Sequence, residues 1–516
     1  MSDKNQVSDE ARKAVNDKVS NTPSGFVTII QETGRSSQKR RLDAQRAREK
    51  AEAEKNKESL GNHKASQWLV VVQSKWPEIP AWVTEHHPER LPCSLEQRIL
   101  HGSYNVGLTA VFTNGEKWFI RFPLVGHTSD EYLDLKIINE VKTLKLISEK
   151  TDIPVPEVKA WGSADHNRLG LGPFIMEQFI EGERLKPILS GSSDPGDHIL
   201  SDKLDDRTFE IIYRQLARFM LQLFALDFDQ IGNLPGASSP LQPPLTMTAN
   251  EINLYSGAKV MSPRTEQLST AGEYFNHVVK QHWQQFTTQR NSVYEEERGK
   301  RNYAFHKALG SLVERHTWPE FDRGPFKLIC DDFGPANMIV DNRDDLNIVG
   351  VVDLEWSYIG PAQLLATAPW WILQARPNTL AASDEHAGMY LQYLNKFMQI
   401  LEAEEEKLQP DQRKGLSSLV KRSQENGTMW YLMVLRGFYI DVTDLPCDQL
   451  IASTPDWENL AAEVAGEEAQ AFVTKKLDGL RPFFDEKKMV ESMEEKLKAG
   501  TLDLATVIER LERLLK

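Results

Sequence analysis

The sequence predicts an α+β fold of two lobes, in which a small β-rich lobe precedes a larger, mostly helical one. Two β-prone runs flank Asn114 and Gly115, a pair that tolerates the positive φ angles of a tight hairpin turn. A helical stripe and a further strand-like run follow before residue 182. Beyond that point helical periodicity dominates, interrupted by one segment of short strands.

The first lobe is expected to contain a hairpin over residues 108–123, a helix over residues 131–150 and a strand over residues 173–180. Pro154 and Pro156 end the helical pattern, because proline cannot continue a helix. Apolar residues recur in this helix at approximately helical spacing: Leu135, Ile138, Val141, Leu144 and Leu146.

The second lobe is expected to begin with a loop at residues 189–197, which is rich in glycine and proline. Residues from about 270 to 316 are helical in pattern but polar, which is typical of an insertion or a solvent-facing helix pair. The amphipathic stretch 502–516 is expected to dock on the body of the protein, and binding to a partner is the alternative. The long helix that follows the loop at residues 189–197 has an apolar face formed by Phe209, Ile212, Leu216, Phe219 and Leu223.

These patterns divide the chain into a disordered charged tail (1–65), an N-lobe (66–182), a C-lobe (183–484) and C-terminal amphipathic helices (485–516). The tail contains a basic run at residues 39–50. A nuclear-import signal or a nucleic-acid contact would explain this run. A solvated, salt-bridged helix is the commoner structure for such a run.

Composition excludes several classes of protein. The net charge of -14 repels phosphate backbones, so we do not expect the body of the protein to bind nucleic acid. Cys93, Cys330 and Cys447 are odd in number and far apart, which argues against a disulfide framework and for a reducing compartment. The first thirty residues contain several acids and no apolar core, so we expect no secretory or mitochondrial leader. We therefore expect a cytoplasmic protein without a membrane partner, or a nuclear one if the basic run is an import signal.

The segment over residues 326–356 carries the chemistry. Apolar runs bound its polar residues, so its acids emerge from buried strands, where charge is costly unless a partner such as a metal ion is present. Asp332 and Asn337 fit the spacing D-x-x-x-x-N of a kinase catalytic loop, and Asp353 ends a later strand. In such a loop the aspartate accepts a hydroxyl proton, while oxygen ligands bind Mg²⁺.

Within this segment, CDDFGPAN resembles the HGDxxxxN loop of aminoglycoside phosphotransferases and choline kinases, and VVDLEW resembles their IDWE segment. The resemblance covers roughly residues 90 to 375. It implies a protein-kinase-like fold and an ATP-dependent phosphotransferase that uses ATP and Mg²⁺ and phosphorylates a hydroxyl of an unidentified small molecule. The fungal branch of the family is more similar still, on the residues Pro361, Ala362, Trp370 and Trp371.

The resemblance also implies roles for individual residues. Asp332 would be the catalytic base, with Asn337 and Asp353 as metal ligands. Arg121 stands where the family usually has a lysine, and Glu140 would pair with it, although an ordinary surface ion pair is the alternative. The residues that would contact the nucleotide are Gly102, Ser103, Tyr104, Asn105, Arg121, Glu140, Met176, Glu177, Gln178 and Phe179.

Two positions depart from the family pattern. Cys330 replaces a loop histidine, and because a thiol is a weak hydrogen-bond donor, other groups must brace the loop. Arg121 brings a planar, bulkier cation than lysine. These departures leave a second hypothesis open, a catalytically inactive binding or scaffold protein of the same fold. Asp331 is expected to brace the loop or face solvent, and Glu355 to bond the loop or face the metal.

Overall fold

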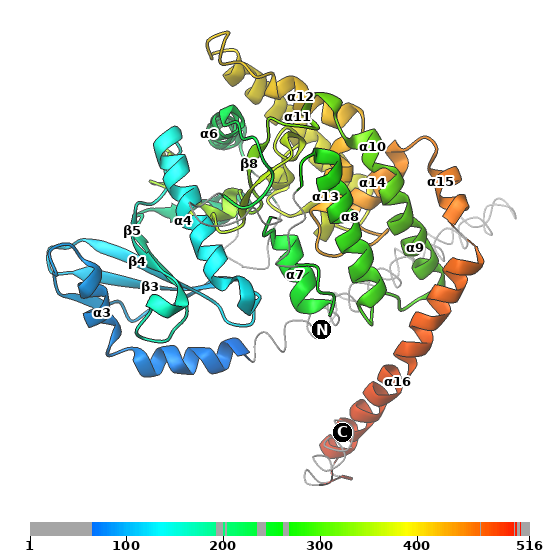
Figure 1. The fold of residues 1–516 in the computed structure, drawn as a ribbon, viewed down its shortest axis with the longest axis horizontal. Coiled ribbons are helices and arrows are strands. Elements are labelled where there is room, and N and C mark those ends of the chain that lie inside the picture. Colours follow the sequence, from blue (N-terminus) through cyan, green and yellow to red (C-terminus); the bar gives the residue numbers. More distant parts are fainter. Residues whose placement is uncertain are drawn as a thin grey trace, which may run out of the picture. The chain divides into compact units, whose positions relative to one another are not determined.

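A six-stranded antiparallel sheet forms the centre of the first lobe (Figure 1). The computed structural model describes residues 64–191, 200–201, 204–234, 244–261, 268–464, 466–499, 501–502 and 506. The strands of the first lobe are β1 (Cys93–Leu95), β2 (Leu100–His101), β3 (Asn105–Phe112), β4 (Lys117–Pro123), β5 (Val158–Gly162) and β6 (Phe174–Gln178). Their order is β1-β3-β4-β6-β5, and β2 also pairs with β3.

Strands β3 and β4 form the predicted hairpin. Leu108 pairs with Ile120 and Ala110 with Trp118, and these four side chains are buried. Gly115 adopts a φ of 88° in the turn, a conformation that glycine reaches without steric cost. A helix over residues 64–75 and α3 (Ile79–His86) add apolar side chains to the core on one face of this sheet.

Helix α4 (Leu133–Lys150) follows the hairpin and packs on the sheet face that carries Ile175, whereas Met176 points into the core beneath α3. Half of the buried positions of α4 are polar, so the predicted apolar stripe was only partly right. Leu135, Ile138 and Leu146 of that stripe are half-buried. The fully buried side chains of α4 are Lys136, Ile137, Asn139, Glu140, Val141, Thr143, Leu144 and Ile147.

The second lobe is mostly helical. Its long helix α6 (Asp206–Ala225) buries all five residues of the predicted apolar face. The carboxylate of Asp205 caps this helix by accepting a hydrogen bond of 2.8 Å from the backbone N–H of Thr208. Helix α11 (Asp384–Glu405) packs against α6, where Glu404 accepts hydrogen bonds from Arg214 and Arg218.

Helices α8 (Ala271–Thr288) and α9 (Glu296–Ser311) occupy the segment expected to be an insertion or a solvent-facing pair. They bury Phe275 and Phe305 in the core, because their few aromatic residues lie on facing sides. Helix α16 (Glu467–Lys498) packs on α9, and the predicted boundary at residue 485 falls inside it. The other helices are α5 (Leu185–Ser190), α7 (Met247–Tyr255), α10 (Val313–His316), α12 (Leu416–Glu425), α13 (Thr428–Leu435), α14 (Leu445–Ser453) and α15 (Trp457–Val464).

Two short sheets carry the segment over residues 326–356. Strand β8 (Lys327–Cys330) pairs with β11 (Ser357–Gly360), and β9 (Met338–Val340) pairs with β10 (Ile348–Val351) and with β7 (Glu183–Arg184). The predicted segment of short, buried strands is therefore present. The predicted fold class, an α+β protein with a small β-rich lobe and a larger helical lobe, is confirmed.

Some predictions fall on other parts of the chain. The basic run at 39–50, nearly all of the tail at 1–65, most of the loop at 189–197 and most of the stretch 502–516 lie outside the described residues. None of the helices within the described ranges combines the length and the apolar character needed to cross a membrane.

A buried histidine makes the stability of the second lobe sensitive to acid. His306 on α9 stacks on Phe286 at 4.4 Å between ring centroids. Burial, with a smaller contribution from nearby His282, lowers the pKa of His306 to about 3. The unfolded chain therefore binds a proton below about pH 6.5 that the folded chain does not bind until about pH 3. As the pH is lowered through this window, the free energy of unfolding decreases.

We expect this histidine to cost about 1.4 kcal/mol of stability for each pH unit below about 6.5. Urea unfolding at pH 7, 6 and 5 would measure this slope. His306→Phe should flatten the slope because it removes the titrating group, while His166→Phe, at an exposed position, should leave it unchanged. Equal slopes for wild type and His306→Phe would refute this account of the acid sensitivity.

Candidate active site

The loop that follows β8 holds Asp332 and Asn337 together. The Asn337 Nδ2 atom donates to the Asp332 carboxylate at 2.9 Å and to the Asp332 carbonyl at 3.0 Å. The carbonyl of Asn337 accepts a hydrogen bond of 2.9 Å from the backbone N–H of Val352. This bond places Asn337 beside the end of β10, where Asp353 follows. The three residues expected at a catalytic centre thus lie next to one another.

Asp331 braces this loop from within. Its side chain is buried, and its Oδ1 atom accepts hydrogen bonds from Arg436 Nη2 at 3.0 Å and from the Tyr358 hydroxyl at 3.4 Å. Cys330 is also buried, which raises the pKa of its thiol to about 12, so it stays protonated and unreactive. Arg436, at the end of α13, therefore supplies the bracing that a loop histidine gives elsewhere in the family that the sequence resembles.

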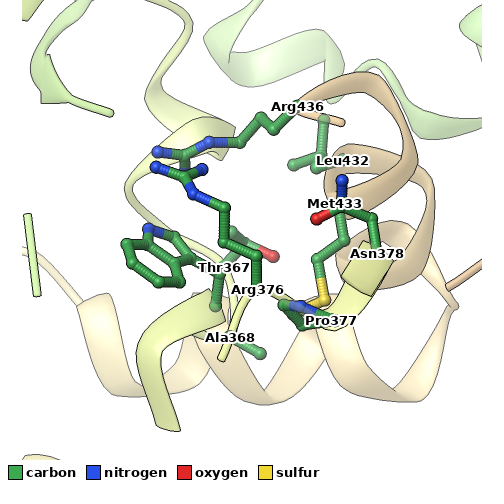
Figure 2. Close-up of a pocket in the computed structure, with 9 residues that line it drawn as sticks. Thr367, Ala368, Arg376, Pro377, Asn378, Leu432, Met433 and Arg436 are labelled. Atoms are coloured by element: carbon green, nitrogen blue, oxygen red, sulfur yellow. The ribbon is translucent and has the colours of Figure 1, made fainter. Parts of the chain in front are cut away.

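Arg376 is a site residue that the sequence reasoning missed. Its Nη2 atom donates to Asp332 Oδ1 at 2.8 Å and to the Asp331 carbonyl at 3.1 Å, and its guanidinium lies 4.3 Å from the Trp370 ring centroid. Figure 2 shows that the guanidinium groups of Arg376 and Arg436 lie side by side. The available signal was the position of Arg376, a single cation that directly follows the apolar run of residues 363–375.

The environment of Asp332 favours its protonated form. Its partly buried position raises the pKa of its carboxyl group, and the negative charge of Asp353 raises it further. The Arg376 guanidinium opposes these effects. A carboxylate with a raised pKa is a better proton acceptor at neutral pH than an ordinary aspartate.

Arg121 on β4 connects four elements through one guanidinium group. Its side chain is buried, and its nitrogen atoms bond Glu140 of α4 at 2.6 Å, Glu177 of β6 at 2.9 Å and Asp353 at 2.9 Å. Arg121 and Glu140 thus form the ion pair that the resemblance implies, and it is not a surface pair. Asp353 adopts a φ of 63°, a conformation that costs a residue other than glycine about 1–3 kcal/mol.

Residues 176–179, which were expected to contact the nucleotide, divide into two kinds. The side chains of Met176 and Glu177 are buried, the first in the sheet core and the second on Arg121. Gln178 is exposed and Phe179 is half-buried. The backbone N–H groups of Gln178 and Phe179 already donate to carbonyls within the lobe.

The turn at residues 102–105 precedes β3 and is closed by a hydrogen bond of 2.9 Å from Gly102 N to Asn105 O. Gly102 and Ser103 are exposed. Tyr104 donates through its hydroxyl to Glu251 of α7 at 2.5 Å. Asn105 is buried, and its Nδ2 atom donates to Asp353 at 3.1 Å and to Glu355 at 2.6 Å.

Lys136 is a second missed residue. It is buried on α4, one turn before Glu140, and its Nζ atom lies 2.8 Å from Glu355 and 3.2 Å from Asn105 Oδ1. Its position four residues before an acid already expected in the site was the available signal. Glu355, whose role the sequence left open, therefore bonds Lys136 of α4 and Asn105 of β3.

The site has more negative than positive groups. Burial raises the pKa of Glu140 and of Glu355, and each has a buried oxygen without a hydrogen-bond partner among the residues that the structure describes. A divalent cation near Asp353 would offset this excess. The network contains two cations, Arg121 and Lys136, and four carboxylates, those of Glu140, Glu177, Asp353 and Glu355.

Asn337 and Asp353 fit a magnesium ion. Because the Asn337 amide nitrogen faces Asp332, its amide oxygen is left for another partner, and the Asp353 side chain is 35% exposed. Within the described parts of the chain, no three His, Cys, Asp or Glu side chains are arranged to hold a metal on their own. Mg²⁺ usually takes one or two carboxylates and completes its shell with water and phosphate oxygens.

Comparisons with known proteins give partial matches. No protein-family model matches the chain. The "Altered inheritance of mitochondria protein 9, mitochondrial" of Candida tropicalis is 31% identical over 109 residues, which are 20% of this chain and 16% of that protein. The protein of the same name from Lachancea thermotolerans is 29% identical over 140 residues, 26% of this chain and 21% of that protein. The matches thus span about a fifth or less of these relatives.

Similar solved structures are phosphotransferases of low sequence identity. A putative aminoglycoside phosphotransferase from Ralstonia eutropha has a TM-score of 0.39 and 13% identity, and the match covers 78% of this chain and 97% of that one. A microcompartment-associated aminopropanol kinase has a TM-score of 0.38 and 12% identity, with 82% and 98% covered. A macrolide 2'-phosphotransferase has a TM-score of 0.38 and 12% identity, with 78% and 96% covered.

The expected cytoplasmic location is wrong, because both curated relatives are named as mitochondrial proteins. The expectation rested on the acids and the missing apolar core in the first thirty residues, which lie outside the described part of the chain. The composition of one segment is a weak guide to the compartment of a protein.

The Arg121 network should be a main determinant of stability. We expect Arg121→Met to lower the free energy of unfolding by about 3–5 kcal/mol, because it leaves buried carboxylates without a partner. Arg121→Lys should lower the free energy of unfolding by a smaller amount, since it keeps the positive charge. It should still destabilise the protein, because an ammonium group cannot bond three carboxylates as a planar guanidinium does. Urea unfolding curves measure both losses.

The matched control is Arg343→Met, which breaks an exposed ion pair with Glu183 at 2.8 Å. Exposed pairs contribute about 0–1 kcal/mol, so this variant should unfold almost as the wild type does. Equal losses in Arg121→Met and Arg343→Met would contradict the importance assigned to the buried network.

Proposed function

We propose that the chain is a phosphotransferase that moves the γ-phosphate of Mg-ATP to a hydroxyl group of a small molecule. The observation that carries the proposal is the hydrogen-bonded pair of Asp332 and Asn337 beside Asp353, which Arg121 holds in place. Phosphoryl transfer needs mainly positioning and charge stabilisation, and these partly buried, mutually bonded groups can supply both.

Each residue has a separate task in this reaction. Asn337 and Asp353 would hold magnesium, which when bound neutralises charge on the phosphates. Arg121 orients the Asp353 carboxylate through a bond of 2.9 Å. The turn at residues 102–105 would cover the phosphates with its backbone.

Asp332 would orient the acceptor hydroxyl and take its proton. Arg376 fixes one carboxylate oxygen of Asp332 and Asn337 fixes the other, so the carboxylate has one orientation. The raised pKa of Asp332 brings its basicity closer to the working pH of an enzyme. The nature of the acceptor depends on the pocket beyond this carboxylate.

We expect Asp332→Asn to reduce phosphoryl transfer by about 10²–10⁴-fold, because the amide cannot accept the hydroxyl proton. ATP turnover would be measured with a small-molecule cell extract as the source of acceptor. ATP affinity, measured by calorimetry, should stay nearly unchanged. Asp344→Asn, at an exposed position, is the control. Wild-type turnover in Asp332→Asn would remove this residue from the mechanism.

Thermal unfolding with ATP, with and without Mg²⁺, tests the metal site. Nucleotide at about 100 times its dissociation constant should stabilise the protein by roughly 2.7 kcal/mol. Asp353→Asn should lose the part that depends on Mg²⁺, and asparagine tolerates the positive φ at this position. Unchanged Mg²⁺ dependence in Asp353→Asn would exclude it as a ligand. No stabilisation of the wild type at millimolar nucleotide would favour the alternative, an inactive protein of this fold that binds a partner.

A further inference from the structure

A pocket adjoining the catalytic loop has an unusual charge. Arg376 and Arg436 line it together with Asn378, Thr367 and apolar side chains (Figure 2). Among the described residues that line it, two are cationic and none is acidic. This is a positive pocket in a chain whose net charge is -14. Such a local inversion of sign concentrates anionic ligands at the pocket.

The two arginines are paired with acids on the side of the loop, whereas none of the described residues that line the pocket is acidic. Each bonds one acid on the side of the loop, Arg376 to Asp332 at 2.8 Å and Arg436 to Asp331 at 3.0 Å. Their side chains are 16% and 17% exposed, so neighbouring like charges repel each other in a region that water screens poorly. A second anionic group on the open side would relieve this repulsion.

Polar atoms of the pocket lack partners. Arg436 Nε and Thr367 Oγ1 are buried and make no hydrogen bond within the described parts of the chain, and Thr367 is 5% exposed. Buried donors without partners are rare in native proteins, because each costs about 1–3 kcal/mol. Because both atoms are closed to solvent, a ligand with several acceptor oxygens would satisfy them only after these side chains move.

The geometry of Arg376 suits recognition of an oxyanion. The ring of Trp370 lies against its guanidinium and Asp332 binds one nitrogen, so the planar group is held in place before a ligand arrives. A guanidinium matches the oxygen atoms of carboxylates and phosphates. Arg376 lines the pocket and also bonds Asp332. An anion bound to Arg376 would therefore be separated from the proposed proton acceptor only by this guanidinium group.

On the basis of the proposed function, we infer that the acceptor is a hydroxyl compound that carries a phosphate or carboxylate group. This group binds Arg376 and Arg436, and its hydroxyl meets Asp332. A cationic amine does not fit this pocket, since two guanidinium groups would face it.

The test uses the full-length protein saturated with Mg-ADP, so that the nucleotide site is filled. Inorganic phosphate, acetate and choline are titrated separately at constant ionic strength, and binding is followed by calorimetry. We expect phosphate or acetate to bind and choline not to bind. Tighter binding of phosphate would identify a phosphorylated acceptor, and tighter binding of acetate would identify a carboxylic acid.

Asn378→Asp places a carboxylate in the pocket and should weaken anion binding about tenfold or more. Mg-ADP affinity should be unchanged, and Asn378→Ser is the uncharged control. If Asn378→Asp does not fold, Arg376→Gln serves the same purpose, because it removes one of the two cations. Anion binding that is equal in these variants and the wild type, absent throughout, or weaker than choline binding would overturn the inference. Failure of Mg-ADP to bind would instead count against the proposed function, and the two failures are therefore distinguishable.

Discussion

The guanidinium group of Arg121 is the constraint on which the site depends. It lies on β4 and binds carboxylates from α4, from β6 and from Asp353, two residues after β10, so both lobes meet on one side chain. Removing such ions from water costs several kcal/mol each unless the geometry is good and the remaining donors are used. A planar fork with donors in fixed directions meets that condition, and a lysine would not. The strained backbone of Asp353 is held by this bond and by Asn105.

Two further arginines brace the loop in which Cys330 stands where the family pattern has a histidine. Arg376 and Arg436 come from segments well separated from the loop in sequence, yet both bond its consecutive acids. The loop is therefore braced by charged hydrogen bonds, which are roughly twice as strong as neutral ones. The thiol of Cys330 has no part in this arrangement and packs as a small apolar group.

Local patterns predicted the parts of the molecule that local forces determine. The hairpin, the apolar face of α6 and the strands around the catalytic loop followed from periodicity and turn residues. The pairing of Asp332 with Asn337 followed from a short spacing that leaves few backbone conformations. The partners of Lys136, Arg376 and Arg436 could not be found in this way, because they are distant in sequence and only the folded chain brings them together. The stripe on α4 was only partly right because its buried face serves an ionic network, and periodicity analysis assumes that buried residues are apolar.

The hydrogen bond of 2.5 Å between the Tyr104 hydroxyl and Glu251 has a consequence for kinetics. Tyr104 belongs to the turn of the first lobe, whereas Glu251 lies on α7, and Asn250 of the same helix bonds the segment that precedes α4. Under the proposed function, a nucleotide that enters beneath the turn would have to break these contacts, and the product would have to break them again to leave. Exchange of nucleotide, rather than transfer of the phosphoryl group, would then set the pace of turnover.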